Sequence, residues 1–374
     1  MTAAKNEAPT IHLVAIDDGS GNIAVVYQDA EGNREETVQP SVVERGAILG
    51  VSGNGPRVWG IGEHRYTVRS STSAQLSTLE PDYQISDANL ALVADTLIEA
   101  GLGDSVIAVG CTLPANQFYN RGDERSPIAK DRIKAKADNL KRQVINEYGA
   151  QQAPQIVHVI VYPEAIPAYF YASDPSRVDA TPGAVWSPKQ TSLVVDLGEF
   201  TDDLAIIHND DVVTFATHEN GVHKMVERFH TLLIREAATL GIKEAKSIPA
   251  VDLKTIIERG YTGSDVDNPV VIAKRKDVRH LVEEAARHLG ELVKADIDKL
   301  TRGRQIDRLI FVGGGANWLG HIAQEWHDVV DIPQDPHLAI CRGVHLLLQS
   351  QRESILKQAH AALAKREATK ETTQ

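Results

Sequence analysis

The residues best suited to binding a charged ligand lie in two stretches of similar pattern. In each, an apolar run ends in Asp-x-Gly and is followed, after a small or polar turn, by a second apolar run; the stretches begin at Leu13 and Leu193. A β-hairpin whose tip carries a carboxylate, glycines and a hydroxyl offers backbone N–H groups to an anion and a carboxylate to its metal. The sequence therefore predicts one anion-binding hairpin used twice.

Asp17 and Asp196 end the first apolar run of each hairpin. An unpaired carboxylate buried at such a position is strongly unfavourable, and a Mg²⁺ ion carried with its water shell by nucleotide phosphates would balance it. Either Asp-x-Gly alone is also typical of an ordinary turn. Its repetition in matching hairpins favours a shared ligand, which we expect to be a nucleoside triphosphate.

Two further candidates lie on loops. Gly313-Gly314-Gly315 follows an apolar run, and backbone without Cβ atoms lets a flat or anionic ligand come close; a sharp strand-to-helix turn explains the same residues. Glu164 also follows an apolar run and is bracketed by Pro163 and Pro167, which would mount a base or a water-positioning group rigidly. By itself, Glu164 is more typical of a surface glutamate.

Common phosphate and zinc motifs are missing from the sequence. It contains no G-x-x-x-x-G-K-[ST] and no G-x-G-x-x-G leading from a strand into a helix. His218 and His223 resemble a zinc-protease pair at first, but they are five residues apart where one helix face requires about four, and Gly221 interrupts them. Nucleotide binding would therefore depend on the hairpins.

Charge and composition narrow the class of protein. The formal net charge of −12 over 374 residues argues against direct binding of nucleic acid, since affinity for phosphate backbones comes mainly from clustered Lys and Arg. The composition is that of an ordinary globular protein, and neither a membrane-spanning nor a signal-peptide pattern occurs, so we expect a cytoplasmic protein without a membrane partner. Cys111 and Cys341 stand alone within apolar runs and predict buried thiols.

Strands and helices are expected to alternate along the chain. Apolar runs predict strands at 105–111, 156–162 and 309–312, and helical periodicity predicts helices at 87–100, 126–148, 277–300 and 337–349. The basic residues spread along 126–148 are typical of a solvated helix face. Such alternation indicates α/β layers with partly parallel sheets, to which the hairpins add antiparallel strands.

Taken together and in order, these residues resemble the actin/sugar-kinase/heat-shock chaperone ATPase superfamily and, within it, the ParM/StbA family of plasmid-partitioning actins. Motifs similar to those of the family stand at residues 16–23, 109–114, 163–168, 195–198 and 312–316. The resemblance implies an α/β, actin-like fold of two similar domains with mixed sheets flanked by helices around a nucleotide cleft, each with a small insertion subdomain.

The resemblance also implies where the domains lie. The first would span 11–186 with an insertion at about 37–85 and would be completed by a closing helix at 337–350. The second would span 190–335 with an insertion at about 241–276, and 354–374 would form a polar tail.

The function implied by the resemblance is ATP-driven assembly into filaments that push or segregate plasmid DNA, with hydrolysis driving filament turnover. The cofactors would be ATP or ADP and Mg²⁺. The partners would be further copies of the chain and a DNA-binding adaptor protein bound to a plasmid centromere, without direct contact between this chain and nucleic acid.

Carried over by position, the resemblance implies roles for individual residues. Asp17 and Asp196 would hold Mg²⁺ through water, and together with Glu164, which would position or activate the attacking water, they form the expected catalytic set. The expected nucleotide-binding residues are Asp18, Gly19, Ser20, Gly21 and Asn22 at the first hairpin, Gly198 and Thr201 at the second, and Gly313, Gly314, Gly315 and Ala316 at the adenosine.

Two departures from the family pattern bear on hydrolysis. Ala24 stands where the family usually has a lysine that contacts phosphates, and Glu199 and Phe200 replace small residues beside the expected γ-phosphate position. The leading interpretation is a filament-forming ATPase. The alternatives are a small-molecule kinase of the same superfamily and a non-hydrolysing structural actin homologue.

Overall fold

The computed structural model describes residues 9–48, 57–72, 74–120, 127–177, 179, 187 and 189–371. The chain divides into two compact units, which we name unit 1 (Met1–Val178 with Leu338–Gln374) and unit 2 (Asp179–His337). The expected end of the first domain at residue 186 and the last three residues of the expected tail lie outside the described residues.

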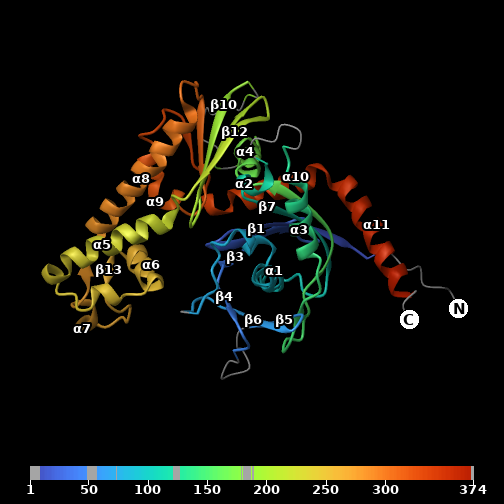
Figure 1. Ribbon diagram of the computed structural model, residues 1–374, viewed down its shortest axis with the longest axis horizontal. Helices are drawn as coiled ribbons and strands as arrows, with labels where there is room; N and C mark the ends of the chain where they lie inside the picture. The colour runs from blue at the N-terminus through green and yellow to red at the C-terminus, as the bar shows by residue number, and fades with distance from the viewer. Residues whose placement is uncertain are drawn as a thin grey trace. The chain divides into compact units, whose positions relative to one another are not determined.

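A five-stranded mixed sheet forms the centre of unit 1 (Figure 1). Its order is β3-β2-β1-β7-β9; β1, β2 and β3 are antiparallel neighbours, whereas β7 is parallel to β1 and β9 to β7. The strands are β1 (Ile11–Asp18), β2 (Asn22–Gln28), β3 (Arg34–Pro40), β7 (Val106–Leu113) and β9 (Gln155–Pro163). The first predicted hairpin is therefore β1 and β2.

The rest of unit 1 consists of a small sheet and the surrounding helices. The small sheet has the order β4-β6-β5-β8 and contains β4 (Val43–Arg45), β5 (Val58–Ile61), β6 (His64–Val68) and β8 (Ile145–Asn146). The helices are η1 (Pro81–Ile85), α1 (Asp87–Glu99), α2 (Ala115–Phe118), α3 (Lys130–Leu140), α4 (Ile166–Ala172), α10 (Ala339–Ser350) and α11 (Arg352–Glu371). Ser86 caps α1 by accepting the N–H of Asn89.

Side chains of β1 alternate between two apolar layers. Val14 and Ile16 pack in the layer formed with α1 and the small sheet. Leu13 and Ala15 pack in the layer formed with α10 and α11. Because successive side chains of a strand point to opposite faces, both layers draw on one continuous apolar run.

The closing helix α10 is fixed to unit 1 by a close contact and an ion pair. A Cβ on Gly343 would overlap the backbone of Pro167 at the start of α4. Arg342 is buried and donates to both carboxylate oxygens of Glu36 in β3, each at 2.8 Å. Only glycine at position 343 permits this approach of the two helices.

Two segments differ from the sequence-based expectation. The expected polar tail forms helix α11 through residue 371, because Ile355, Ala359 and Leu363 recur every four residues and are buried against the sheet. The helix expected over 126–148 is shorter, since α3 ends at Leu140 and residues 145–146 pair with β5 as strand β8.

Unit 2 has a second sheet with the same plan. Its order is β12-β11-β10-β15-β16, with β10, β11 and β12 antiparallel, β15 parallel to β10 and β16 parallel to β15. The strands are β10 (Thr191–Leu197), β11 (Asp202–His208), β12 (Asp211–His218), β15 (Arg308–Val312) and β16 (Val330–Asp331). The second predicted hairpin is β10 and β11.

Helices α5, α8 and α9 pack on one face of this sheet, against alternate residues such as Leu193, Val195 and Leu197. The remaining elements in chain order are α5 (Val222–Leu240), η2 (Ala245–Ser247), α6 (Ala250–Arg259), β13 (Tyr261–Thr262), α7 (Pro269–Ile272), β14 (Lys276–Asp277), α8 (Arg279–Thr301), α9 (Ala316–Ala323) and η3 (Pro336–Leu338). The predicted α/β class with mixed sheets flanked by helices is confirmed. Within the described part of the chain, no helix combines the length and apolar character that a bilayer span needs.

Replacing Ile355 by Ala should lower the free energy of unfolding by about 2–5 kcal/mol, because this 2 % exposed side chain would leave a cavity between α11 and the sheet. Urea unfolding followed by circular dichroism measures the change. Ile272→Ala in α7, where the side chain is 42 % exposed, is the matched control and should change the value by less than about 0.5 kcal/mol. Equal effects of the two substitutions would contradict the packing of α11.

Candidate functional site

The tip of the first hairpin is held by residues that follow β3. The hydroxyls of Ser20 and Thr78 each donate to the other residue's carbonyl oxygen, at 3.2 and 3.0 Å. Ser41 donates through its hydroxyl to the carbonyl oxygen of Gly19 (2.6 Å) and through its N–H to that of Gly21 (2.9 Å). The carbonyl oxygens of the predicted phosphate loop are thus turned into the protein, which fixes the loop backbone.

Asp17 lies on the α10 side of the sheet and is half-buried. Thr112, near the end of β7, donates its hydroxyl to Asp17 Oδ1 at 3.2 Å. Burial, and to a lesser extent the charge of Asp18, raises the pKa of the Asp17 carboxyl to about 7. A cation nearby would favour the ionised form of this group.

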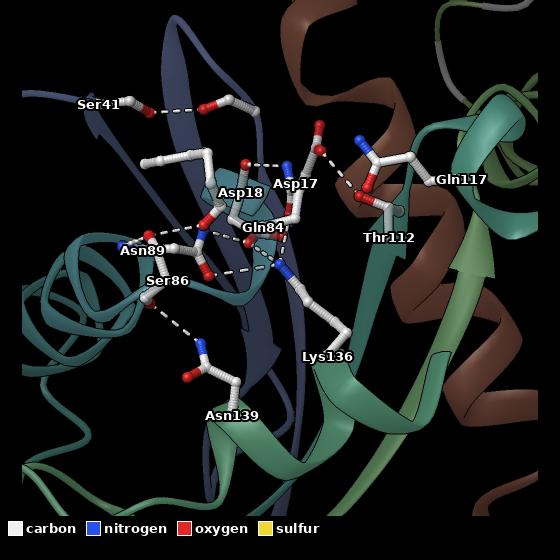
Figure 2. A network of polar contacts seen from close by, with 12 residues as sticks. Asp17, Asp18, Ser41, Gln84, Ser86, Asn89, Thr112, Gln117, Lys136 and Asn139 are labelled. Carbon is white, nitrogen blue, oxygen red and sulfur yellow. Dashed lines mark hydrogen bonds and ion pairs between the residues drawn. The ribbon is translucent and has the colours of Figure 1, made fainter. Parts of the chain in front are cut away.

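Asp18 points to the opposite face, into the buried polar network that Figure 2 shows. Its side chain is 1 % exposed and forms an ion pair with the fully buried ammonium of Lys136 from α3. Asn89 donates to Asp18 Oδ2 (2.6 Å), and Lys136 also donates to Gln84 and to Asn89 Oδ1 (3.3 Å). The Asp18 carboxylate is therefore engaged in the interior of unit 1, away from the hairpin surface.

Lys136 is a residue of this site that the sequence analysis did not single out. It was one of several basic residues on a helix interpreted as a solvated face. Its spacing to Asn139 and Leu140 places all three on one helix face, and all three are buried. The signal that distinguishes Lys136 from the neighbouring lysines is its position on the same helix face as a buried leucine.

Packing around position 24 leaves an alanine there, where the family usually has a lysine. Ala24 lies opposite Asp17 in the β1–β2 register and is buried in the α10 layer, where Cys341 Sγ donates to the carbonyl oxygens of Ala15 and Ala24 at 3.4 Å. Among the described residues, Lys136 of α3 supplies a buried cation at the other face of this hairpin, where it is balanced by Asp18.

Glu164 follows β9 at the same edge of the sheet as Asp17 and Thr112, because the parallel strands β1, β7 and β9 all end there. Its N–H donates to the carbonyl oxygen of Leu113 at the end of β7 (2.8 Å). The next residue, Ala165, is buried at φ +70°, a conformation unfavourable for a residue with a Cβ. This strained turn fixes the backbone from which the Glu164 side chain leaves.

The tip of the second hairpin is a tight turn attached to α5. The N–H of Gly198 donates to the carbonyl oxygen of Thr201 at 2.9 Å. The N–H groups of residues 221–223 donate to carbonyl oxygens at 198–200, and a Cβ on Gly221 would lie 2.4 Å from the Glu199 carbonyl oxygen. The start of α5 therefore holds this tip in place.

Glu199 and Phe200, which replace the small residues usual in the family, each contact another side chain of unit 2. Lys254 of α6 forms an ion pair with Glu199 at 2.6 Å. The Phe200 ring contacts the imidazole of His223, with 5.4 Å between the ring centroids. The added carboxylate is thus balanced by a lysine that lies more than 50 residues further along the chain and that no local pattern indicates.

Thr201 and Asp196 lie beside a second carboxylate. The hydroxyl of Thr201 donates to Asp203 (3.1 Å), as does that of Thr217 (2.6 Å). Asp203 pairs with Asp196 in the β10–β11 register, so both carboxylates lie on the same face of the sheet. The two side chains are buried, at 8 and 2 % exposure for Asp196 and Asp203. Sequence analysis did not include Asp203.

The glycine turn after β15 packs against β10. Gly313 has φ +84°, and a Cβ there would lie 2.4 Å from Asp196 Oδ1; a Cβ on Gly315 would lie 2.3 Å from Leu197 Cγ. At Gly314, a Cβ would meet nothing within 4 Å, so its backbone is the open part of the turn. Ala316 is buried at the start of α9. Unit 2 thus brings Asp196 together with the predicted glycines.

Comparison with solved structures identifies the fold. The archaeal actin homologue Ta0583 has 17 % identity and a TM-score of 0.70, over 91 % of this chain and 100 % of that one. A 15-stranded ParM filament from Clostridium botulinum has 15 % identity and a TM-score of 0.64, over 91 % and 99 %. ParM of Bacillus thuringiensis with ATP has 14 % identity and a TM-score of 0.61, also over 91 % and 99 %. The chain therefore has an actin-like fold.

Part of the sequence of unit 1 also matches a family model. Residues 12–175 match the family model described as plasmid segregation protein ParM, N-terminal. The match includes Asp17, Thr112, Lys136 and Glu164. The resemblance to the ParM/StbA family stated from the motifs is confirmed for this part of the chain. The comparison with curated proteins found no match.

Replacing Lys136 by Met should lower the free energy of unfolding by about 3–5 kcal/mol, because it leaves the buried Asp18 carboxylate without its counter-charge. Lys134→Met on the same helix is the matched control; the Lys134 side chain is 76 % exposed and pairs with Asp138, so little or no change is expected. Urea unfolding measures both.

The double variant Lys136→Met with Asp18→Asn tests the pair itself. Its effect should be smaller than the sum of the two single effects by about 1 kcal/mol or more, since the second change removes the unpaired charge that the first creates. If the two single effects on the free energy of unfolding simply add in the double variant, the charges of Lys136 and Asp18 do not interact.

Proposed function

We propose that this protein is an actin-like ATPase that binds ATP with Mg²⁺, polymerises and segregates plasmid DNA. The observation that carries the proposal is the match of residues 12–175 to the ParM N-terminal family, because that segment holds Asp17, Thr112 and Glu164 at one sheet edge. Proteins of similar fold support it: ParM of Bacillus thuringiensis was solved with ATP, Ta0583 with ADP, and the Clostridium botulinum ParM as a filament.

Each unit has backbone that we propose to contact nucleotide. The backbones of residues 19–22 and 198–201 would contact phosphates. Both loops are held in place by hydrogen bonds that their carbonyl oxygens accept. The glycine turn 313–315 would contact the adenosine, with Gly314 as its open position. The domain limits stated from the resemblance belong to the same proposal.

The acidic side chains of the two hairpins fit a divalent cation. Asp17 has a pKa raised to about 7, and Asp196 lies beside Asp203 on one face of a sheet. A positive charge nearby would stabilise the ionised carboxylates in both places. Mg²⁺ prefers oxygen ligands and keeps several waters, through which Asp17 and Asp196 would hold it. When bound, the ion supplies charge neutralisation for the transferring phosphoryl group.

The remaining roles are positioning roles. Glu164 would orient the attacking water or accept its proton from a turn that Ala165 fixes. Lys136 acts through Asp18: by neutralising that buried carboxylate it fixes the end of β1, and with it the position of Asp17. The positioning of reactants and the balancing of charge are the main requirements of phosphoryl transfer.

The proposed partners follow from this function. Further copies of the chain would form the filament, and hydrolysis would drive its turnover. A DNA-binding adaptor on a plasmid centromere would connect the filament to its cargo, since the net charge of −12 argues against direct contact with DNA. The cytoplasmic location expected from the sequence stays a prediction.

Light scattering at rising protein concentration, run in parallel with a phosphate-release assay, tests the proposal. We expect polymer in the presence of ATP, phosphate release that follows polymerisation, and less polymer with ADP or without nucleotide. Sugar-dependent turnover without polymer would favour the kinase alternative. Polymer without phosphate release would favour the non-hydrolysing homologue, and either result would contradict the proposal.

Two substitutions test the residue roles. Asp196→Ala should abolish phosphate release while the circular dichroism spectrum is kept, because the Mg²⁺ contact is lost. Glu164→Ala should still bind ATP but release phosphate about 100-fold more slowly. Asp211→Ala and Glu31→Ala, at exposed positions of the two units, are the controls and should behave as the parent protein. Normal phosphate release by either site variant would remove that residue from its role.

A further inference from the structure

A buried acidic residue lies on the helix-covered face of the second sheet, close to the hairpin tip. Asp202 begins β11 and shares its face with Leu204 and Ile206, which pack against α5 and α8 in the core of unit 2. It is therefore on the face opposite to Asp196 and Asp203. The phosphate-loop roles proposed above do not use it.

Asp202 lacks the side-chain donors that normally accompany a buried carboxylate. Its side chain is fully buried, and within the described residues neither carboxylate oxygen accepts a hydrogen bond from a side chain. Burial, and the negative charges of Asp296 and Asp203, raise the pKa of Asp202 to about 8. In unit 1 the buried Asp18 is balanced by Lys136, but the ion-pair partner found for Asp202 in the described chain is a histidine.

His218 and Asp296 complete the group around Asp202. His218 ends β12 directly opposite Asp202 in the strand register, and Asp296 comes from α8. The His218 Nδ1 atom is 3.6 Å from Asp202 Oδ1, and its Nε2 atom is 3.5 Å from Asp296 Oδ1. Charge-assisted hydrogen bonds between nitrogen and carboxylate are about 2.7–2.9 Å long, so these contacts are longer than such bonds.

The three side chains are close enough to share one ion. One possible ligand atom from each residue lies within 4.8 Å of the other two. Tetrahedral Zn²⁺ with bonds of about 2.0–2.1 Å separates its ligand atoms by about 3.4 Å, so side-chain shifts of about 1 Å would suffice. Asn220 donates to the second oxygen of Asp296, which is the kind of outer contact that orients a ligating carboxylate.

We propose that Asp202, His218 and Asp296 bind one divalent transition-metal ion of the Zn²⁺ or Mn²⁺ type. One imidazole and two carboxylates form a ligand set that such ions accept, and their two positive charges would balance the two carboxylates. The ion joins the start of β11, the end of β12 and helix α8, and thus stabilises the sheet directly behind the second hairpin. This site is separate from the proposed Mg²⁺–nucleotide contacts and does not depend on them.

Calorimetric titration of Zn²⁺, and separately of Mn²⁺, into the untagged full chain stripped of metal tests the proposal without nucleotide. We expect one equivalent to bind to the parent protein and to be lost in His218→Ala. His208→Ala, which removes a half-buried histidine of the neighbouring strand, is the matched control and should keep that equivalent. Asn220→Ala should weaken binding about 10-fold, because it removes the outer contact to Asp296.

Thermal unfolding gives a second measurement that does not depend on His218→Ala folding well. At a metal concentration of 100 times the dissociation constant, the melting temperature of the parent protein should rise by about 5 °C or more. Asp202→Leu should fold at least as well as the metal-free parent, since it replaces a buried acid with an apolar side chain like Leu204, and its melting temperature should not respond to metal.

Two results would overturn the proposal. The first is a parent protein that binds neither Zn²⁺ nor Mn²⁺ and whose melting temperature responds to neither ion. The second is metal binding that persists unchanged in both His218→Ala and Asp202→Leu, which would place the ion elsewhere. Both results leave the ATPase proposal unaffected, because the assay contains no nucleotide.

Discussion

Carboxylates at the ends of buried strands impose the main electrostatic constraint on this fold. Taking such a group out of water is unfavourable unless a cation or several donors replace the water. Unit 1 meets the requirement at Asp18 with the ammonium of Lys136 and the amide of Asn89. Unit 2 has the same strand order but places Asp202 beside a histidine and a second acid. The two sheets therefore differ in how they balance charge, although their topology is the same.

The hairpins and the α/β class were predictable because the signals are local. In β1 and β10 both sheet faces are buried, so the strands form continuous apolar runs, and the first polar residue marks where each run ends. Asp17 and Asp196 were found in this way. Gly313 was found as part of a glycine run, and the structure adds the reason for it, since only a residue without Cβ fits against Asp196 at a positive φ.

The supporting residues were not predictable, because their roles depend on pairs distant in sequence. Lys136 resembles its exposed neighbours until α3 packs against Asp18, and Lys254 gives no local sign that it balances Glu199. Helix α11 was missed for a related reason. Its buried stripe of Ile355, Ala359 and Leu363 is a single residue wide, and the polar residues around it dominate the average composition.

The order of elements along the chain has a consequence for biosynthesis. One face of the first sheet, with Leu13, Val26 and Val157, is covered by helices α10 and α11, which are translated only after the whole of unit 2. At a translation rate of about 5–20 residues per second, this apolar face stays uncovered for roughly 8–30 s between the synthesis of residue 178 and that of residue 338. Unit 2 is continuous and is complete before α10 and α11 emerge, so the segment that is synthesised first is among the last to reach its native state.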